Sequence, residues 1–475
     1  MSDHTAQPDS TKPLRGAKGT TDGYPEGPGF LSRRNVLRAF GASAAVVGGG
    51  GLLEACSSSI KGASSTTTTG GGSSGGKITI GWIHPLTGAL AGFGAPDGFV
   101  LSKIRETTPY KNGFKIGGKT YEVQINSYDT QSSPTRAGQL AQQAINGDHV
   151  DLLLASSTPE TVNAVASTAQ TLGTPLVCAN IPWESWYLNL FPKGNPQHAT
   201  EKAKYVVMYF LGAEHLVQAF IPMWNRIHNQ LKTNKTVAAA FPNDSDGNAF
   251  RAVFPEIAKS AGYTFELSSP YTDGTTNYSS MISQFKNSKA DFFTNVPLPP
   301  DFATMWKQSV QQGFKPKLAT VAKVLLFPPD AYALGDLVNN VATDAWWAPS
   351  LPWTSSFTGE TCQQLADEYE SSHGQWNSNI SNYTLFEIAH AALTSVNNPH
   401  DKNEVADAIH QVNVNGVAGP IDFTSSKAPA PGVAITLPVG IQWQKGTKYP
   451  LEAKVVDNTL LPQAKITGDL NPTNK

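Results

Sequence analysis

Residues 151–180, DLLLASSTPETVNAVASTAQTLGTPLVCAN, decide the fold, because they place a helical pattern between two short apolar runs. The first run, residues 150–154, predicts a buried strand that ends at a Ser-Ser turn. Gly173 marks the end of the helix, and residues 175–179 predict the next strand. Strands joined through a helix are typical of parallel sheets that carry helices on both faces. The stretch therefore predicts an α/β fold.

The same alternation extends through the rest of the chain. Further strands are predicted at residues 77–83, 121–126, 236–241, 263–267, 291–295 and 317–321. Helices are predicted after Ser133 and at residues 99–107, 246–261, 277–287 and 301–312. Residues 433–444 predict a late antiparallel strand pair. Because these units are too many for one sheet, we expect an α/β protein of two Rossmann-like lobes.

The stretch SRRNVLRAFGASAAVVGGGGLLEACSSS, residues 32–59, has the layout of an export signal. Residues 32–37 resemble the twin-arginine signal, with Val36 where Phe is usual, and residues 53–56 resemble a bacterial lipobox. The apolar run between them is shorter than the roughly 20 residues that span a bilayer. A disordered basic tail followed by an apolar patch is the alternative.

These motifs predict a signal peptide over residues 1–55 and a lipid-modified Cys56 as the first mature residue. Two or more acyl chains anchor a protein stably to a membrane. The Ser/Thr/Gly-rich residues 56–76 lack the apolar content to pack and predict a flexible tether. Lipid anchoring on the outer face of the cell membrane is therefore expected.

Composition and motifs exclude several function classes. The net charge of −2 over 475 residues gives no indication of a nucleic-acid partner. Cys178 and Cys362 lie in apolar or helical contexts, which favours two buried free thiols over a disulfide, and no metal-ligand spacing occurs. The sequence has no G-x-S-x-G elbow, P-loop or H-E-x-x-H motif, so we expect a protein that is not an enzyme.

Four stretches occur in the order typical of one protein family. They are KITIGWIHPLTGALAGFG (77–94), NSYDTQSSPTRAGQLAQQAI (126–145), residues 151–180 and VNGVAGPIDF (414–423). They carry a P-L-T-G turn, a P-x-x-A helix start, a Ser-Ser turn before a helix, and a G-P-I-x-F segment. In this order they resemble the leucine/isoleucine/valine-binding family of type I periplasmic binding proteins, which serve ABC importers. The resemblance covers residues 77 to about 460.

The resemblance implies a ligand cleft between two lobes that are joined by three crossovers. We place the crossovers near residues 192–198, 346–352 and 422–428. Lobe 1 would comprise residues 77–195 plus 349–424, and lobe 2 residues 196–348 plus 425–470. Residues 199–232 look like an insertion that begins with a helix.

Together with the export signal, the resemblance implies an extracytoplasmic solute-binding lipoprotein of a branched-chain-amino-acid-type ABC importer. Such a protein captures a small-molecule ligand by lobe closure and delivers it to a permease served by ATPase subunits. No cofactor, metal or nucleic acid is expected. The alternatives are a ligand-sensing lipoprotein without transport and a cell-surface hydrolase.

The resemblance also implies a set of ligand contacts. The candidate residues are Phe93, Ser156, Ser157, Ile181, Trp183, Asp246, Leu298, Lys323 and Trp347. Ser156 and Ser157 end a strand before a helix, where hydroxyls and N–H groups suit a carboxylate, or where one Ser only caps the helix. Phe93 takes the place of an aromatic residue over the ligand, with turn packing as the alternative. At Ile181 and Trp183 the sequence departs from the family, because Pro182 has no N–H to offer.

The second lobe departs further from the family pattern. Lys323 aligns with the family carboxylate that pairs with the ligand's α-ammonium, and a like charge there would repel an amino acid. Lys323 binds an anionic end or only extends from a strand edge. Asp246 and Leu298 match family aromatic positions, with loop solvation as the alternative for Asp246. With Trp183 and Trp347 beside the crossovers, an aromatic or apolar acid, or an amide, is favoured.

Overall fold

The computed structural model describes residues 73–474 of the chain. The predicted signal peptide, Cys56 and most of the tether lie outside the described residues. Strand β1 (Ser73–His84) begins four residues before the predicted end of the tether, and Ser73 already pairs with Lys119 of β3 (Lys119–Asp129). Residues 73–76 therefore belong to the sheet rather than to the tether.

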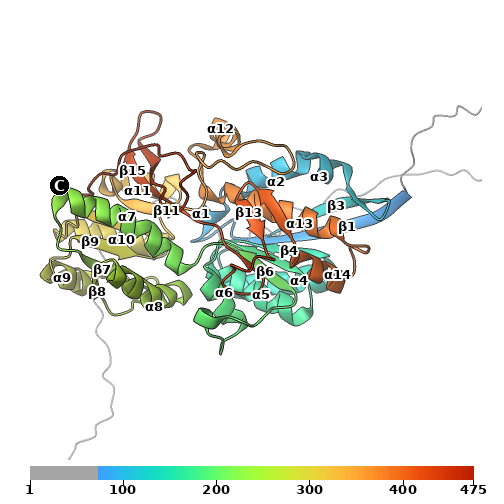
Figure 1. Ribbon diagram of the computed structural model, residues 1–475, viewed down its shortest axis with the longest axis horizontal. Helices are drawn as coiled ribbons and strands as arrows, with labels where there is room; N and C mark the ends of the chain where they lie inside the picture. Colours follow the sequence, from blue (N-terminus) through green and yellow to red (C-terminus); the bar gives the residue numbers. More distant parts are fainter. Residues whose placement is uncertain (1–72, 475) are drawn as a thin grey trace, which may run out of the picture. The chain divides into compact units, whose positions relative to one another are not determined.

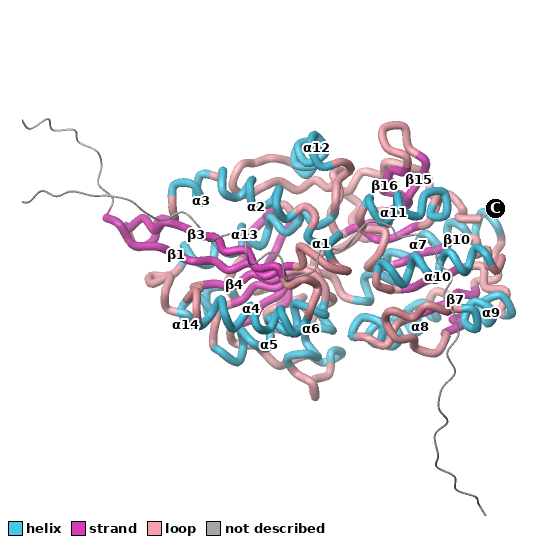
Figure 2. Tube along the Cα trace, turned by 180° about the vertical axis from the view of Figure 1, so that it is seen from behind, coloured by secondary structure: helices cyan, strands magenta, loops and turns pink. Residues whose placement is uncertain are grey.

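The first lobe is built on a seven-stranded sheet with the order β14-β6-β5-β4-β1-β3-β2. Its other strands are β2 (Phe114–Ile116), β4 (Leu152–Ala155), β5 (Leu176–Ala179), β6 (Val206–Tyr209) and β14 (Val433–Ala434). Only β2 runs antiparallel to its neighbour. In Figure 2, β1 and β3 run side by side as two long strands.

Helices accompany this sheet, and a small hairpin lies beside it. The helices are α1 (Ala91–Gly94), α2 (Asp97–Glu106), α3 (Thr108–Asn112), α4 (Pro134–Asn146), α5 (Pro159–Leu172), α6 (Trp183–Leu190), α12 (Cys362–His373), α13 (Tyr383–Ser395) and α14 (Lys402–Ile409). Two 3-10 turns, η1 (Pro196–His198) and η3 (Ser378–Asn382), and the hairpin β12 (Asn413–Gly416) with β13 (Gly419–Asp422) complete the lobe.

The second lobe has its own seven-stranded sheet, with the order β16-β15-β11-β10-β9-β7-β8. The strands are β7 (Thr236–Ala240), β8 (Thr264–Leu267), β9 (Phe292–Asn295), β10 (Leu318–Val321), β11 (Ala342–Ala345), β15 (Val439–Lys445) and β16 (Leu451–Asp457). The helices are α7 (Ala213–Leu231), α8 (Ser245–Ser260), α9 (Ser279–Asn287), α10 (Pro299–Gln311) and α11 (Pro328–Leu334), followed by the 3-10 turn η2 (Gly335–Val338). Figure 1 shows α7 to α10 on the left and α2 to α6 of the first lobe towards the right.

Local sequence explains where these elements begin and end. The Ser133 side chain accepts a hydrogen bond from the N–H of Arg136, and Pro134 opens α4, so the predicted helix start is confirmed. Gly173 ends α5 with a φ of 66°, in the left-handed region that glycine tolerates. Cys178 and Cys362 are buried free thiols, as predicted. The expected α/β fold of two lobes is confirmed.

Two of the three predicted crossovers are wrong. Residues 199–232 are no insertion: β6 pairs with β5 in the first sheet, and α7 packs beside β10, β11 and β15 of the second. The first crossover therefore lies at residues 210–212, not at 192–198. The buried run from Val206 to Tyr209 is an inner strand between β5 and β14. It resembles part of a helix only when its apolar residues are counted together with those of α7.

The third crossover is also displaced. Strand β14 still pairs with β6, and β15 pairs with β11, so the chain changes lobes at residues 435–438 rather than 422–428. The second crossover follows β11 at Trp346, within the predicted residues 346–352. Lobe 1 accordingly extends to Leu211 and Ala434, beyond the predicted ends at 195 and 424.

Candidate functional site

A small cavity of about 40 Å³ lies between the two lobes. Its lining residues follow the carboxyl ends of parallel strands in both sheets, which is where α/β sheets bind ligands. The first lobe contributes Phe93, Thr158, Pro159, Asn180, Pro182, Phe210 and Leu211. The second lobe and the second crossover contribute Leu216, Asp246, Phe250, Val296, Ala322, Lys323, Asp344 and Trp346.

Of the predicted site residues, Phe93, Asp246 and Lys323 line this cavity. Phe93 also packs edge-to-face on Phe327 of the second lobe, with ring centroids 4.6 Å apart. Asp246 lies in the first turn of α8, and Lys323 follows β10 with a φ of 68°. The sequence thus brings one aromatic and two charged side chains to the same site from three distant segments.

Lys323 is held by three carboxylates, which the sequence analysis did not foresee. Its Nζ lies 2.8 Å from Asp246 Oδ2 and 3.8 Å from Asp244 Oδ2 of its own lobe, and 2.5 Å from Glu160 Oε1 of the other. Burial acts to lower the pKa of Lys323, but Asp246, Glu160 and Asp244 outweigh it and raise the pKa well above its usual value. Lys323 is therefore a charged link between the lobes.

The predicted serines are buried behind the cavity and do not line it. Ser156 Oγ accepts a hydrogen bond from Trp82 Nε1 at 3.1 Å, and Ser157 Oγ accepts one from Asn180 Nδ2 at 3.3 Å. Instead, Thr158 lines the cavity, and its N–H donates to the carbonyl of Asn180 at 3.1 Å. The hydroxyls expected for a ligand carboxylate thus serve the packing of the turn.

The remaining predicted contacts also lie outside the cavity. Trp183 Nε1 donates to Glu214 Oε1 at 3.1 Å, beside the first crossover. Ile181 is buried between two residues that do line the site, and Leu298 precedes α10. Trp347 is fully buried against Trp376.

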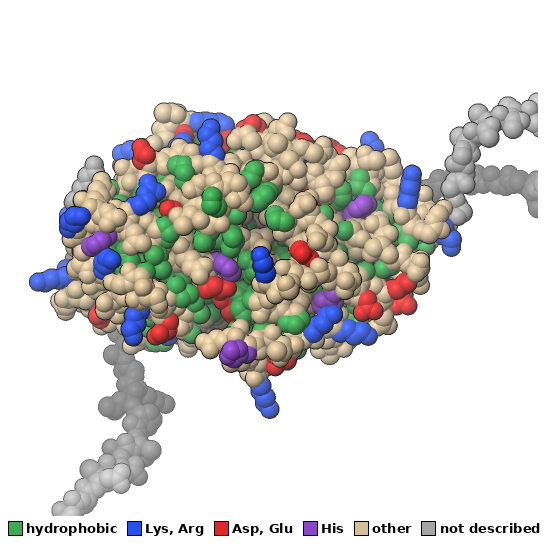
Figure 3. All heavy atoms as spheres, viewed as in Figure 1, with side chains coloured by type: hydrophobic (Ala, Val, Ile, Leu, Met, Phe, Trp, Pro, Cys, Tyr) green, Lys and Arg blue, Asp and Glu red, His purple; other side chains and the backbone are tan. Residues whose placement is uncertain are grey.

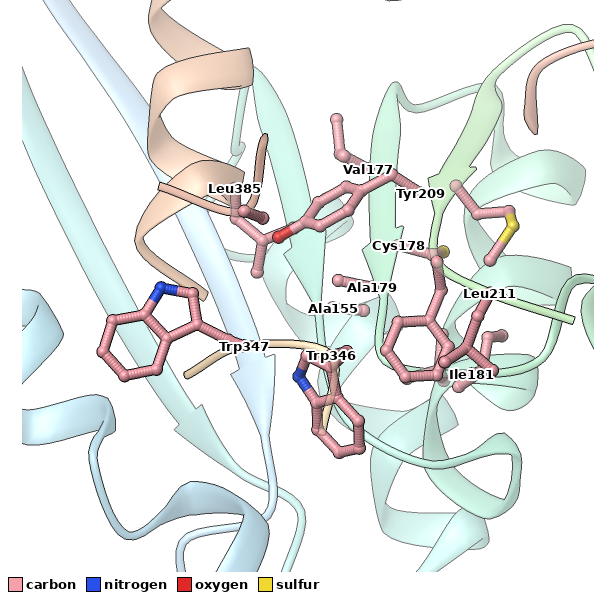
Figure 4. Close-up of a cluster of buried hydrophobic side chains, with 14 of the residues drawn as sticks. Ala155, Val177, Cys178, Ala179, Ile181, Tyr209, Leu211, Trp346, Trp347 and Leu385 are labelled. Carbon is pink, nitrogen blue, oxygen red and sulfur yellow. The ribbon is translucent and has the colours of Figure 1, made fainter. Parts of the chain in front are cut away.

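Trp346, rather than its predicted neighbour Trp347, reaches the cavity. Figure 4 shows Trp346 close to Ile181 and Leu211, whereas the indole of Trp347 points away from them. Trp346 also packs edge-to-face on Phe210, with ring centroids 5.0 Å apart. Both residues follow the end of β11, and only the first of them lines the cavity.

Several lining residues were missed for identifiable reasons. Phe210 and Leu211 follow β6, which the sequence analysis took for a helix, so their place at a strand end went unnoticed. Asn180 directly follows β5, but the sequence analysis selected its neighbour Ile181 as the candidate contact. Asp344 lies within β11, where a buried carboxylate has no sequence signal beyond its apolar surroundings.

Burial governs the ionisation of the two carboxylates that line the cavity. It raises the pKa of Asp246 to about 7, although Lys323 acts in the opposite direction. Burial likewise raises the pKa of Asp344 to about 7. Burial therefore opposes the ionisation of both carboxyl groups, and Lys323 acts against this effect at Asp246.

Within residues 73–474, no group of three or more His, Cys, Asp and Glu side chains has an arrangement that could hold a metal ion. Over the same range, none of the helices combines the length and the apolar character that crossing a bilayer requires. On the face drawn in Figure 3, basic and acidic side chains are interspersed.

Comparisons with known proteins agree with this architecture. Residues 77–434 match the family described as periplasmic binding protein. The chain is 22% identical over 397 residues to Leu/Ile/Val-binding protein homolog 7 of Brucella melitensis, covering 81% of this chain and 94% of the relative. The Brucella abortus homologue is 23% identical over 403 residues, covering 81% and 94%.

Solved structures share the fold at lower identity. A leucine-binding protein from Thermotoga maritima superposes with a TM-score of 0.64 at 18% identity, covering 80% of this chain and 99% of that one. A solute-binding protein of an ABC transporter from R. palustris, in complex with 4-hydroxybenzoate, gives 0.63 at 18% identity, covering 80% and 96%.

Proposed function

The chain belongs to the periplasmic binding protein family, and from this premise we propose that it is the solute-binding lipoprotein of an ABC importer of the branched-chain-amino-acid type. The observation that carries the proposal is the cavity lined by side chains of both lobes at the carboxyl ends of their strands. A solute held there contacts both walls at once and stabilises the closed arrangement of the lobes.

Lobe closure is the step that couples binding to delivery. Two contacts cross the gap beside the cavity: the Lys323–Glu160 ion pair and the Phe93–Phe327 ring contact. Rotation about the crossovers at residues 210–212 and 435–438 separates or joins these groups as the lobes move. The closed form then docks on a permease, which is driven by ATPase subunits.

The ligand in this proposal is not an ordinary amino acid. The start of α5 has no free N–H of Thr158 or Pro159 for an α-carboxylate, because Pro159 has none and that of Thr158 donates to the Asn180 carbonyl. The aromatic or apolar acid favoured by the sequence has less support, because the one cation lining the cavity already pairs with three carboxylates. Among the solutes that the sequence favoured, an amide fits the cavity better.

Export and anchoring can be tested directly in cells of the native type. Metabolic labelling with radioactive palmitate should mark the wild-type protein, and the Cys56→Ala variant should lose the label. The double variant Arg33→Lys with Arg34→Lys should keep the protein inside the cell. A labelled Cys56→Ala protein would contradict lipidation at this position.

Transport and sensing differ in what the partner does with the ligand. Transport requires that deletion of this chain, or of permease and ATPase genes beside it, abolishes uptake of a radiolabelled ligand. A sensing lipoprotein leaves uptake unchanged and alters only a transcriptional or behavioural response. Uptake that survives deletion of this chain would contradict the import function.

The alternative of a cell-surface hydrolase has one observation in its favour. Ser127 Oγ lies 2.7 Å from His84 Nε2, and His84 Nδ1 lies 2.6 Å from Asp97 Oδ2, the order of groups in a serine hydrolase. However, Ser127 lies within β3, paired with Trp82, rather than at the sharp turn of a nucleophile elbow. We expect no labelling by a fluorophosphonate probe. Labelling that Ser127→Ala removes would favour the hydrolase.

A further inference from the structure

We infer that the interlobe cavity takes an organic cation without a carboxylate, a primary amine on an apolar or aromatic body, with its ammonium held by Asn180, Asp246 and Asp344. The inference deepens the proposed function and rests on it. Three features support it: unpaired acceptors on residues that line the cavity, an excess of carboxylates, and the first-lobe wall, where Pro159 and Pro182 offer no N–H to an anion.

The orientation of the Asn180 amide follows from a chain of amides behind it. Asn382 Nδ2 donates to Asp97 Oδ1 at 2.8 Å, and Asn379 Nδ2 donates to the carbonyl of Phe93 at 2.5 Å. Both therefore present their Oδ1 atoms to Asn180, whose Nδ2 donates to them at 2.7 and 3.0 Å. The Oδ1 of Asn180 is left as a buried acceptor without a protein partner.

Two carboxylate oxygens of the second-lobe wall also lack a hydrogen-bond partner. Asp246 Oδ2 is engaged by Lys323 at 2.8 Å, but Asp246 Oδ1 has no hydrogen-bond partner, and neither has Asp344 Oδ1. Asn180, Asp246 and Asp344 are 4%, 3% and 1% exposed, and all three line the cavity. A buried acceptor without a donor is costly, and an ammonium supplies three donors.

The charges at the site also favour a bound cation. Lys323 is the one cation among the lining residues, while Asp246 and Asp344 line the cavity and Glu160 and Asp244 flank Lys323. Lys323 therefore faces three carboxyl groups, Asp344 adds a fourth to the site, and burial opposes the ionisation of Asp246 and Asp344. A bound cation offsets the excess negative charge and favours the ionised forms, so its binding releases protons.

The first-lobe wall offers little to a ligand carboxylate. The start of α5 is the natural anion site of such a wall, but Pro159 has no N–H and the N–H of Thr158 is used by the Asn180 carbonyl. Pro182 removes a second N–H after β5. Glu160 places a carboxylate of the protein in the first turn of α5, where it pairs with Lys323.

Aromatic side chains complete the cavity around the polar end. Phe93, Phe210, Phe250 and Trp346 line it together with aliphatic groups. Such walls bury an apolar or aromatic body, and aromatic faces attract an adjacent ammonium. An arylalkylamine or a branched alkylamine satisfies both parts of the site.

The test compares matched solutes by isothermal titration calorimetry on the full-length protein. The probes are 2-phenylethylamine, tyramine and isoamylamine, against 3-phenylpropionate, which replaces the ammonium by a carboxylate, and L-phenylalanine, which adds one. We expect at least one of the three amines to bind with release of protons, seen as a dependence of the heat on the buffer. We expect 3-phenylpropionate and L-phenylalanine to bind at least tenfold more weakly.

Variants distinguish this site from non-specific cation binding. Asp344→Asn and Asp246→Asn should each weaken amine binding by about tenfold to a hundredfold, since each removes a charge-assisted hydrogen bond. Asp330→Asn is the matched control, because Asp330 also carries an unpaired oxygen and a pKa raised by burial to about 6, yet lies outside the cavity. Equal losses in all three variants would overturn the assignment.

The outcomes separate this inference from the proposed function. Binding of 3-phenylpropionate or L-phenylalanine as tight as that of the amines, or no binding of any of the three amines at millimolar concentration, overturns the amine assignment. If 3-phenylpropionate binds and compacts the protein, lobe closure stands and only the ligand class fails. An amine that binds without compaction supports the ligand class and contradicts closure.

Discussion

The two walls of the cavity stabilise their buried polar side chains by different interactions. On the first-lobe wall, the side chains of Asn180, Asn379 and Asn382 form neutral amide hydrogen bonds that fix one another. On the second-lobe wall, Lys323 and Asp246 form a charged pair that leaves carboxylate oxygens unpaired. The first wall fixes its free acceptor, Asn180 Oδ1, through neutral hydrogen bonds, whereas the free acceptors of the second wall belong to carboxyl groups.

The largest expected effect comes from breaking the charged wall. Lys323→Met leaves Glu160, Asp246 and Asp244 without their cation, and loss of one partner of a buried ion pair costs about 3–5 kcal/mol. Urea denaturation should show this loss in the free energy of unfolding. Protonation of the carboxylates at low pH should restore part of it.

An exposed ion pair provides the control for Lys323. Lys445 Nζ lies 3.2 Å from Asp336 Oδ1, and both side chains are mostly exposed, at 66% and 82%. Lys445→Met should therefore change the free energy of unfolding by at most about 1 kcal/mol. Similar losses in the free energy of unfolding of the two variants would mean that the buried cluster stabilises the protein no more than an exposed ion pair.

The amide wall should respond more moderately. Asn382→Ala removes the acceptor of Asn180 and the donor to Asp97, and each buried group left unpaired costs about 1–3 kcal/mol. The variant should unfold at lower urea and also bind ligand more weakly, because the Asn180 amide is then free to turn. Asn397→Ala, at an exposed asparagine, should be nearly neutral. Unchanged ligand affinity in Asn382→Ala would contradict the role of the amide chain.

The charged wall should make stability depend on pH, in a direction that the pKa of Asp344 fixes. Burial raises this pKa from 3.8 to about 7, so the folded protein keeps a proton that the unfolded chain releases. The stabilisation is present below pH 4 and is lost as pH rises through about 7, with a slope of about 1.4 kcal/mol per unit. Asp344→Asn should flatten this dependence, measured by urea denaturation at several pH values. Asp246, whose pKa burial also raises to about 7, leaves part of the slope in the variant, so a slope equal to that of the wild type would contradict the assignment to Asp344.

The smallest effect is expected at the adjacent indoles. Trp346→Phe shortens a cavity side chain, so it should weaken ligand binding by about 0.5–1.5 kcal/mol with little change in stability. Trp347→Phe alters a fully buried side chain outside the cavity and should affect stability instead. Calorimetry and denaturation of both variants check the contrast, and the reverse pattern would place the wrong indole in the site.

The sequence predicted the lobes well because each βα unit carries its own local signals. Residues 151–180 alone specify β4, α5 and β5, with Gly173 at the helix end. The errors arose at β6 and β14, where a buried strand in the middle or at the edge of a sheet has no alternating pattern. Lobe membership is decided by pairing between distant strands, which local patterns do not contain.

The site was predicted only in part, for a related reason. The family resemblance assigned Phe93, Asp246 and Lys323 to the site, but the partners that decide their chemistry come from other segments. Glu160 lies 163 positions before Lys323 in the chain, and no local pattern links them. The sequence therefore indicated that the site departs from amino-acid binding, and the fold was needed to show that the cation is already neutralised.

Small-angle X-ray scattering of the full-length protein, titrated with 2-phenylethylamine, tests the central claim most directly. The account predicts a smaller radius of gyration at saturation, reached at about tenfold to a hundredfold higher amine concentration in Asp344→Asn and at the wild-type concentration in Asp330→Asn. A bound amine that leaves the radius of gyration of the wild-type protein unchanged would contradict closure of the two lobes on a solute.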